Sequence, residues 1–146
     1  MRRRARAQVI VWVAVMLPLL FLPIVGLTMD AGVVFDAKRD LQNLADGAAR
    51  VGAMEIDEDV LHTSPRGEVR VHPAHADAAI RTYLFDRLHY AGPDPLIDTA
   101  HDNRAVVTVY RDIHPTFLRL LHVGPVRIRA TGSAAPCAGL IVATCT

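Results

Sequence analysis

The sequence predicts an α+β fold, in which a long N-terminal helix precedes a small head of about three antiparallel strands and one or two further helices. Three observations predict it. Residues 9–29 carry no formal charge, and residues 33–53 place apolar side chains at alternating spacings of three and four. The remainder mixes β-branched runs with helical stripes that are bounded by proline and glycine. With 146 residues in all, one small domain beyond the first helix is expected.

Charge is distributed unevenly along the chain. Four of its 16 basic residues, Arg2, Arg3, Arg4 and Arg6, lie in the first 29 residues, which contain no acidic residue. The other 117 residues carry 12 basic and 15 acidic residues, a net charge of −3. Binding to nucleic acid requires a concentrated basic face, so nucleic acid is not expected as a partner.

The uncharged run from Val9 to Met29 has the length of a membrane span. As a helix its 21 residues would extend about 31 Å, the thickness of a hydrocarbon core. The arginines before it predict that residues 1–8 are cytoplasmic and that the chain after Asp30 lies outside the cytoplasm. A cleaved secretory signal, with about 7 to 15 apolar residues and a small-x-small site, and a buried core helix are the alternatives.

Two prolines, Pro18 and Pro23, lie inside this run. Each removes an intrahelical hydrogen-bond donor, which membrane helices tolerate when neighbouring groups satisfy the freed carbonyls. They predict a kink in the helix and not a break.

Residues 30–56 are predicted to extend the helix as an amphipathic segment. One face carries Val34, Ala37, Leu41, Leu44, Ala48 and Val51, and beside it Ala45, Ala49 and Ala53 with Gly52 form a smooth edge. Such an edge allows another backbone to approach closely. Packing on the protein's own head and packing on another subunit are both compatible with this pattern.

Residues 57–135 are predicted to form the head. The acidic run from Glu55 to Asp59 is expected to be a solvated helix end or loop, because it lacks the spacing and the glycine of a calcium-binding loop. Turn residues follow at 62–67, and a short strand is predicted at Glu68 to His72. A helical stripe after Pro73 predicts a helix from Ala74 to Tyr90.

The second half of the head reads as two strands around a short helix. Arg104 to Ile113 is rich in β-branched residues, and Pro125 to Gly132 alternates apolar with polar side chains, so both are predicted strands. The segment from Pro115 to Pro125 opens on proline and closes on Gly-Pro, as short helices do.

Residues with catalytic or metal-binding chemistry do not gather in the sequence. His72, His75 and Asp77 have a spacing seen in some metal sites, but no second cluster completes a tetrahedral set. Neither a nucleophile elbow nor a phosphate-binding loop occurs. We expect no catalytic residue, no cofactor and no metal; a membrane-tethered hydrolase or metalloenzyme that uses these three residues is the alternative.

The tail, residues 136–146, holds the two cysteines of the chain, Cys137 and Cys145. If this part lies outside the cytoplasm, its environment allows a disulfide. A bridge between the two cysteines is favoured over two free thiols, and it would close a small loop of modest stabilising effect.

Two stretches carry a resemblance to a known family. The stretch "RARAQVIVWVAVMLPLLFLPIVGLTMDAG" and the following "LQNLADGAARVGA" resemble the TadE/TadG-like proteins of the tight-adherence (Flp-type) pilus-assembly system, a pilin-related family. The first matches a basic start, a proline-containing membrane helix and an Asp at its exit, here Asp30. The second matches the motif that includes Leu41, Gln42, Ala45 and Asp46. A weaker likeness covers "VVTVYRDIHPTFLRLLHVGPVRIRATGSAA".

The resemblance implies a function. Family members are similar to pilins, with one helix half in the membrane and half under a globular head, so the chain is expected to be a non-enzymatic minor pilin or pseudopilin. Expected partners are the membrane, other pilin-like or pilus-assembly proteins and a prepilin peptidase that would cleave between Ala7 and Gln8. The chain departs from the family in two positions. It has Ala7 where many members have glycine, and it has Trp12 where pilins carry a glutamate. The missing glutamate brings it closer to the TadG-like branch. A bitopic envelope receptor or sensor with a small ligand-binding ectodomain is the alternative function.

Overall fold

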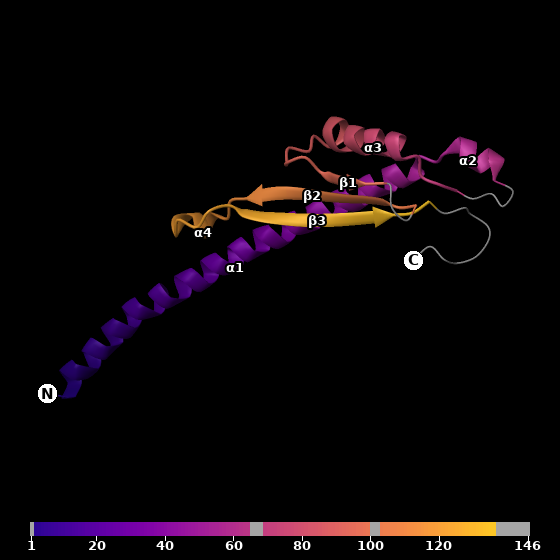
Figure 1. Cartoon of the computed structure of the whole chain (residues 1–146). Coiled ribbons are helices and arrows are strands. Elements are labelled where there is room, and N and C mark those ends of the chain that lie inside the picture. The colour runs from indigo at the N-terminus through magenta and orange to yellow at the C-terminus, as the bar shows by residue number, and fades with distance from the viewer. Residues whose placement is uncertain (1, 65–68, 100–102, 137–146) are drawn as a thin grey trace. The chain divides into compact units, whose positions relative to one another are not determined.

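The structure is a computed structural model that describes residues 2–64, 69–99 and 103–136 (Figure 1). It has the predicted α+β fold. Its elements are, in order, α1 (Arg2–Met54), α2 (Glu58–Thr63), α3 (Pro73–Thr82), the π-helical turn η1 (Tyr83–Arg87), β1 (Leu96–Asp98), β2 (Ala105–Ile113), α4 (Thr116–Leu120) and β3 (Val126–Ala134).

Contacts between residues divide the chain into two compact units. The first unit combines Met1–Asp36 with Ile113–Val126, and the second combines Ala37–Asp112 with the chain from Arg127 onward. Helix α1 therefore contributes its first part to one unit and its last part to the other. The first unit contains α4, and the second contains most of the sheet together with α2, α3 and η1.

Helix α1 is a single element of 53 residues. It includes Pro18 and Pro23 without interruption, and it ends at Met54, where the Glu55 N–H turns back to the Gly52 carbonyl. The segments expected as a membrane helix and as its amphipathic extension are thus parts of one helix. The kink at the prolines stays a prediction.

The core of the second unit combines the last part of α1 with the sheet and α3. Leu41, Ala45, Ala48 and Ala49 of α1 are completely buried, as are Ile80, Leu84, Val107 and Val109. Small residues make this packing possible: a Cβ at Gly52 would lie 2.9 Å from Ile80 Cγ1 and 3.2 Å from Ala105 Cβ. The smooth edge of α1 is the surface on which the head is built.

The three strands form a sheet in the order β1-β2-β3. β1 and β2 are antiparallel, with Ile97 opposite Val107, and the arrows of β2 and β3 run in opposite directions in Figure 1. Along β3, Ile128, Ala130 and Gly132 are buried while the residues between them are exposed. This alternation is the one predicted, with one solvated face.

The predicted strand at Glu68 to His72 is wrong. In the described part of that segment, Val71 makes one isolated antiparallel bridge with Ile56, flanked by backbone hydrogen bonds of 2.8 Å on each side. The third strand is instead β1, which lies in a segment that reads as a loop because Pro93 and Pro95 precede it. A strand of three residues is too short to show a period of two.

The helix predicted from Ala74 to Tyr90 begins at Pro73 and ends earlier than expected. Its last turn is η1, and His89 then adopts a positive φ of 52° that ends the helical path before Tyr90. The acidic run also gains a defined role, because the Asp57 side chain accepts hydrogen bonds from the Asp59 and Val60 amides and so caps α2.

Tyr90 completes the open edge of β2. Its hydroxyl donates to the Tyr110 carbonyl at 2.5 Å and accepts from the Tyr110 N–H at 2.9 Å. The β1–β2 register, extended by two residues, would put Asp94 opposite Tyr110, but Asp94 lies outside β1. The hydroxyl therefore occupies the place of the missing strand residue. Gly92 leaves room for it, since a Cβ there would collide with the Tyr90 hydroxyl.

We predict that Gly132→Ala destabilises the second unit by about 1–3 kcal/mol through overpacking. A Cβ at Gly132 would collide with the Ala45 carbonyl and lie 2.6 Å from the Asp46 nitrogen, and backbone atoms of a helix cannot move aside cheaply. Thermal unfolding of the full chain in detergent, followed by tyrosine near-UV circular dichroism, measures the effect. The control is Gly124→Ala, which meets nothing within 4 Å; equal effects of the two substitutions would contradict the prediction.

We predict that Tyr90→Phe lowers stability at neutral pH by about 1–3 kcal/mol, because it leaves two backbone groups of Tyr110 without their partner. Burial raises the pKa of the Tyr90 hydroxyl above its ordinary 10.0, although the hydrogen bond to Tyr110 acts in the opposite direction. A folded-state pKa above the unfolded value means that this contribution is complete below about pH 10 and is lost as the pH rises through the folded pKa.

The same unfolding measurement, repeated between neutral and alkaline pH, tests this titration. The alkaline loss of stability should be smaller in Tyr90→Phe than in the parent. Tyr110→Phe keeps the backbone partner in place and is the matched control, so it should retain the parent's pH dependence. An alkaline loss of the same size in Tyr90→Phe and the parent would contradict the assignment.

Candidate functional site

The main candidate functional surface of the first unit is the exposed apolar part of α1. Between Ile10 and Met29 the large apolar side chains are 48–69% exposed. An apolar surface of this extent is not stable in water and needs lipid or other apolar helices around it. Among the helices in the described part of the chain, α1 is the one that is long and apolar enough to cross a membrane.

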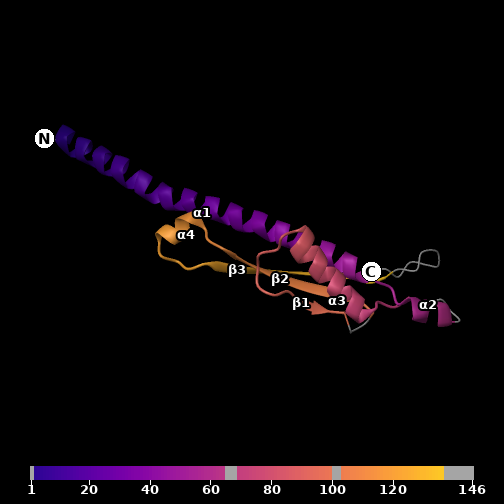
Figure 2. The same ribbon diagram turned by 90° about the horizontal axis from the view of Figure 1, so that it is seen from above.

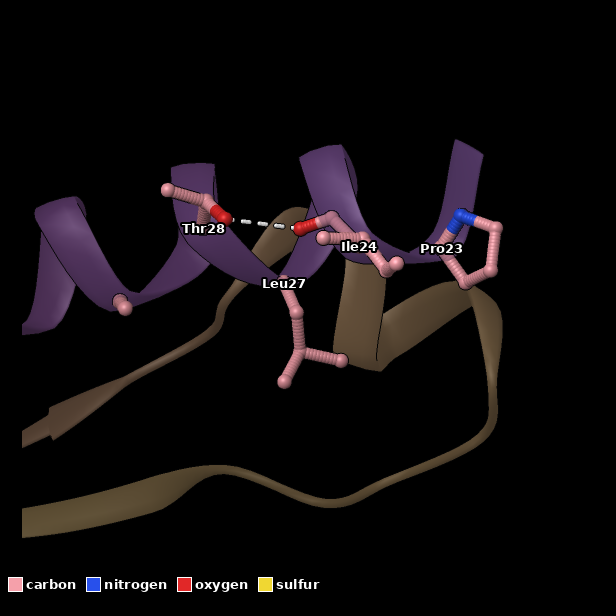
Figure 3. Close-up of a pocket in the computed structure, with 5 residues that line it drawn as sticks. Pro23, Ile24, Leu27 and Thr28 are labelled. Atoms are coloured by element: carbon pink, nitrogen blue, oxygen red, sulfur yellow. Dashed lines mark hydrogen bonds between the residues drawn. The ribbon is translucent and has the colours of Figure 1, made fainter. Parts of the chain in front are cut away.

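A shallow apolar hollow of about 470 Å³ lies on this surface near its C-terminal end (Figure 3). It is lined by Pro23, Ile24, Leu27, Thr28 and Ala31. The one hydroxyl in the lining belongs to Thr28, which donates to the Ile24 carbonyl at 2.8 Å. The hollow therefore presents almost no free polar group.

Asp30 closes the apolar run and is buried, with 4% of its surface exposed. Its carboxylate Oδ2 accepts a hydrogen bond of 2.7 Å from the Leu118 N–H, in the first turn of α4. The first N–H groups of a helix have no partner within the helix, and a carboxylate is a strong acceptor for them. The bond therefore satisfies a buried charge and an otherwise free amide together, across 88 positions of the chain.

A second contact one turn earlier holds the same two segments together. The Phe117 ring lies against Gly26 of α1 so closely that a Cβ at Gly26 would overlap it. Pro115, just before α4, is completely buried. Within the first unit, the connection between β2 and β3 is thus fixed to α1 by one packing contact and one charge-assisted hydrogen bond.

The end of α4 is also well defined. His122 has a positive φ of 60°, its N–H donates to the Arg119 carbonyl, and the Val123 N–H reaches back to the Leu118 carbonyl at 3.0 Å. This is the pattern of a Schellman motif, with a histidine in place of the usual glycine. Helix α4 is short, but both of its ends are closed by specific hydrogen bonds.

In the second unit, the motif residues Gln42 and Asp46 join α1 to the edge strand β3. Gln42 Nε2 donates to Asp46 Oδ1 and to the Thr131 carbonyl, both at 3.0 Å. Beside this bond, the backbone of Gly132 touches that of Ala45. Leu41 is buried in the core. The motif thus supplies the amide, the small residue and the apolar anchor with which the helix packs on the strand.

The other helix-packing residues divide by burial. Leu41, Ala45, Ala48, Ala49 and Gly52 are buried, and Val34, Ala37, Leu44 and Val51 are half-buried. Ala7 and Gln8 lie in the first turns of α1. Cys137 and Cys145 are outside the described residues, so their pairing stays a prediction.

The residues weighed as a metal site hold the start of α3. His72 Nδ1 accepts from the His75 N–H at 3.3 Å, and the two rings stack with their centroids 4.0 Å apart. Asp77 Oδ2 pairs with Arg81 Nε at 3.0 Å, one turn along the helix. Within residues 2–64, 69–99 and 103–136, no group of three or more His, Cys, Asp or Glu side chains is placed to hold a metal.

Sequence reasoning missed Gly26 and Phe117 as partners. Glycine in an apolar run and phenylalanine in a short helix are each common, and only the fold brings them together. The partner of Asp30 could not be predicted either, because it is the backbone amide of Leu118 and every residue type except proline has such an amide. The one signal available was an acidic residue at the end of an uncharged run, where its charge requires a partner.

Comparison with known families shows which proteins the N-terminal segment is related to. Residues 4–55 match the family described as "Putative Flp pilus-assembly TadE/G-like". The chain has a TadE/G-like N-terminal segment. The resemblance drawn from the sequence is confirmed over this segment, which covers nearly all of α1 and connects the chain with Flp pilus assembly. No curated protein and no solved structure matches the chain significantly.

The TadE/G-like segment therefore includes the exposed apolar surface of α1, Asp30 and the Gln42 motif.

We predict that Asp30→Ala releases α4 from α1. The Leu118 amide loses its acceptor, and a hydrogen bond to a charged group contributes about 1.5–3 kcal/mol, so amide exchange at Leu118 should accelerate by roughly tenfold or more.

Hydrogen exchange of the full chain in detergent, read by mass spectrometry at residues 115–123, measures this release. Asp36→Ala, a substitution of an exposed acid six residues further along α1, is the control and should leave the exchange unchanged. Unchanged protection of this segment in Asp30→Ala would mean that packing of Phe117 alone holds α4.

Proposed function

We propose that this protein is anchored in a membrane by the first part of α1 and takes part in assembly of a Flp-type pilus as a minor pilin or pseudopilin. The observation that carries the proposal is the bare apolar surface from Ile10 to Met29, inside a segment that matches the TadE/G-like family. The basic residues before it favour an N-terminus in the cytoplasm and a head on the other side.

The proposed mechanism is packing of α1 against similar helices. The uncharged surface is soluble in lipid, and the hollow around Leu27 gives a neighbouring helix a place to dock. Pilins carry a glutamate in this part of the helix, whereas this chain has Trp12. Its entry into an assembly would therefore depend on shape and apolar contact, not on pairing of a buried charge.

The proposed role is structural and not enzymatic. The polar side chains that stand out in the head, Tyr90, His72 and Asp57, each bond to backbone atoms of the protein itself. Their chemistry is used for the ends of helices and the edge of a sheet. The head then acts by its surface, and a prepilin peptidase that cleaves between Ala7 and Gln8 is a proposed partner in maturation.

We predict that Leu19→Arg prevents stable membrane insertion. Leu19 is near the middle of the apolar run, where an arginine costs about 2.5–3.5 kcal/mol, roughly a hundredfold in partition. Alkaline extraction of native membranes should leave the parent protein in the membrane pellet and deplete the variant from it. Leu96→Arg is the matched control, because Leu96 is equally exposed but belongs to the head; depletion of both variants, or of neither, would contradict the anchor.

Two measurements in the native cell test the pilus role. Loss of the protein should abolish or strongly reduce pili that can be sheared from the cell surface, and the parent sequence should restore them. Unchanged pili would refute the role and favour the receptor or sensor reading. The N-terminal mass of the protein from native membranes separates the two forms of the role, since a start at Gln8 means prepilin processing and an uncleaved start means a permanent anchor.

A further inference from the structure

The connection between β2 and β3 carries an exposed apolar tip. This segment, residues 114–125, is called the α4 loop below. Leu120 is 73% exposed, Leu121 57% and Val123 47%. These three exposed apolar side chains lie at and just after the end of α4, and together they form an apolar patch that is open to a partner.

The position of the α4 loop on α1 indicates what that partner is. Phe117 packs on Gly26 and the Leu118 amide bonds to Asp30, so α4 lies beside the last turn of the apolar run. Gly26 is four residues before Asp30, about 6 Å along a helix. If the apolar run of α1 is in lipid, the α4 loop is at the level where the hydrocarbon meets the headgroups.

The backbone of the α4 loop is prepared for an environment with little water. Pro115 has no N–H, and the Leu118 amide is bonded to Asp30. Four of the amides that follow are bonded inside the loop: Arg119 to the Pro115 carbonyl, Leu121 to the Phe117 and Leu118 carbonyls, His122 to the Arg119 carbonyl and Val123 to the Leu118 carbonyl. Free amides are what prevents irregular chain from entering lipid, and five amides of this loop have a partner.

The charge of the α4 loop is complementary to an anionic lipid surface. Residues 114–125 contain Arg119, His114 and His122 and no acidic residue. All three side chains are exposed. Basic residues beside a small apolar tip are the composition of a segment that lies in the interface plane of a membrane.

We propose that the α4 loop is a second membrane contact, which inserts Leu120, Leu121 and Val123 into the headgroup region of an anionic bilayer beside the exit of α1. The proposal rests on the proposed membrane span of α1. Its consequence is that the head is held by two contacts, a span and a surface loop, which the Asp30 carboxylate links at the point where the span ends.

Tryptophan fluorescence of the full chain in lipid vesicles tests the proposal, because Trp12 is the single tryptophan and is itself in the apolar run. The test variant is Leu120→Trp in a Trp12→Phe background, reconstituted into anionic phosphatidylglycerol-containing vesicles with brominated acyl chains. Bromine near the headgroup end should quench most of its fluorescence, and bromine near the chain ends should quench less. The control is Met54→Trp in the same background; Met54 is 74% exposed at the end of α1, and a tryptophan there should emit as in water.

The parent protein separates failure of this proposal from failure of the anchor. Quenching of Trp12 with no quenching at position 120 would overturn the lipid contact and leave the anchor intact, whereas absence of quenching at both positions would overturn the anchor as well. Blue-shifted emission at position 120 that no brominated lipid quenches would show a protein partner, and would also overturn the proposal. Adding Arg119→Glu should reduce quenching at position 120 in anionic vesicles and not in neutral ones; an equal effect in both would exclude the headgroup contact.

Discussion

The fold depends on one constraint, which is that a single helix must satisfy two different environments. In its first part α1 exposes large apolar side chains from Ile10 to Met29, and in its second part it buries alanines and glycines against a sheet. Large side chains suit a lipid or a loosely packed partner, because they offer area without a required fit. Small ones suit a strand that approaches to backbone distance, as β3 does at Gly132. The size of the side chains therefore changes along α1 together with their burial.

Asp30 stands where these two regimes meet, and its environment explains how an acid is tolerated there. A carboxylate at the end of an apolar run would need water, but this one is buried and accepts a hydrogen bond from the Leu118 amide in the first turn of α4. The α4 loop in turn depends on this acceptor, because its helix is too short to hold itself in place. Asp30 and α4 therefore stabilise one another. Together with Gly26, against which Phe117 packs, they form one local unit of structure.

What the sequence could predict follows from the range of the interactions involved. Periodicity and punctuation located α1, α3, α4, β2 and β3, since each is long enough to show its pattern or is bounded by proline and glycine. They failed at β1, which is three residues long, and at the segment ending in His72, which has β-rich composition but makes a single bridge at Val71. The motif of Leu41, Gln42, Ala45 and Asp46 could be recognised from its resemblance to the family. Its contact with β3 could not be predicted, because the Thr131 carbonyl that Gln42 binds is far away in sequence. The same limit applies to Asp30 and Leu118.

The small size of the sheet is itself a consequence of this arrangement. Three strands, one of them with three residues, cannot bury enough apolar surface to be stable alone. The missing part of the core is supplied by Leu41 and the alanines of α1, so the head is complete only when the helix that carries the apolar run is part of it. The same helix therefore carries the exposed apolar run and supplies part of the core of the head, with no linker between these two parts of its sequence.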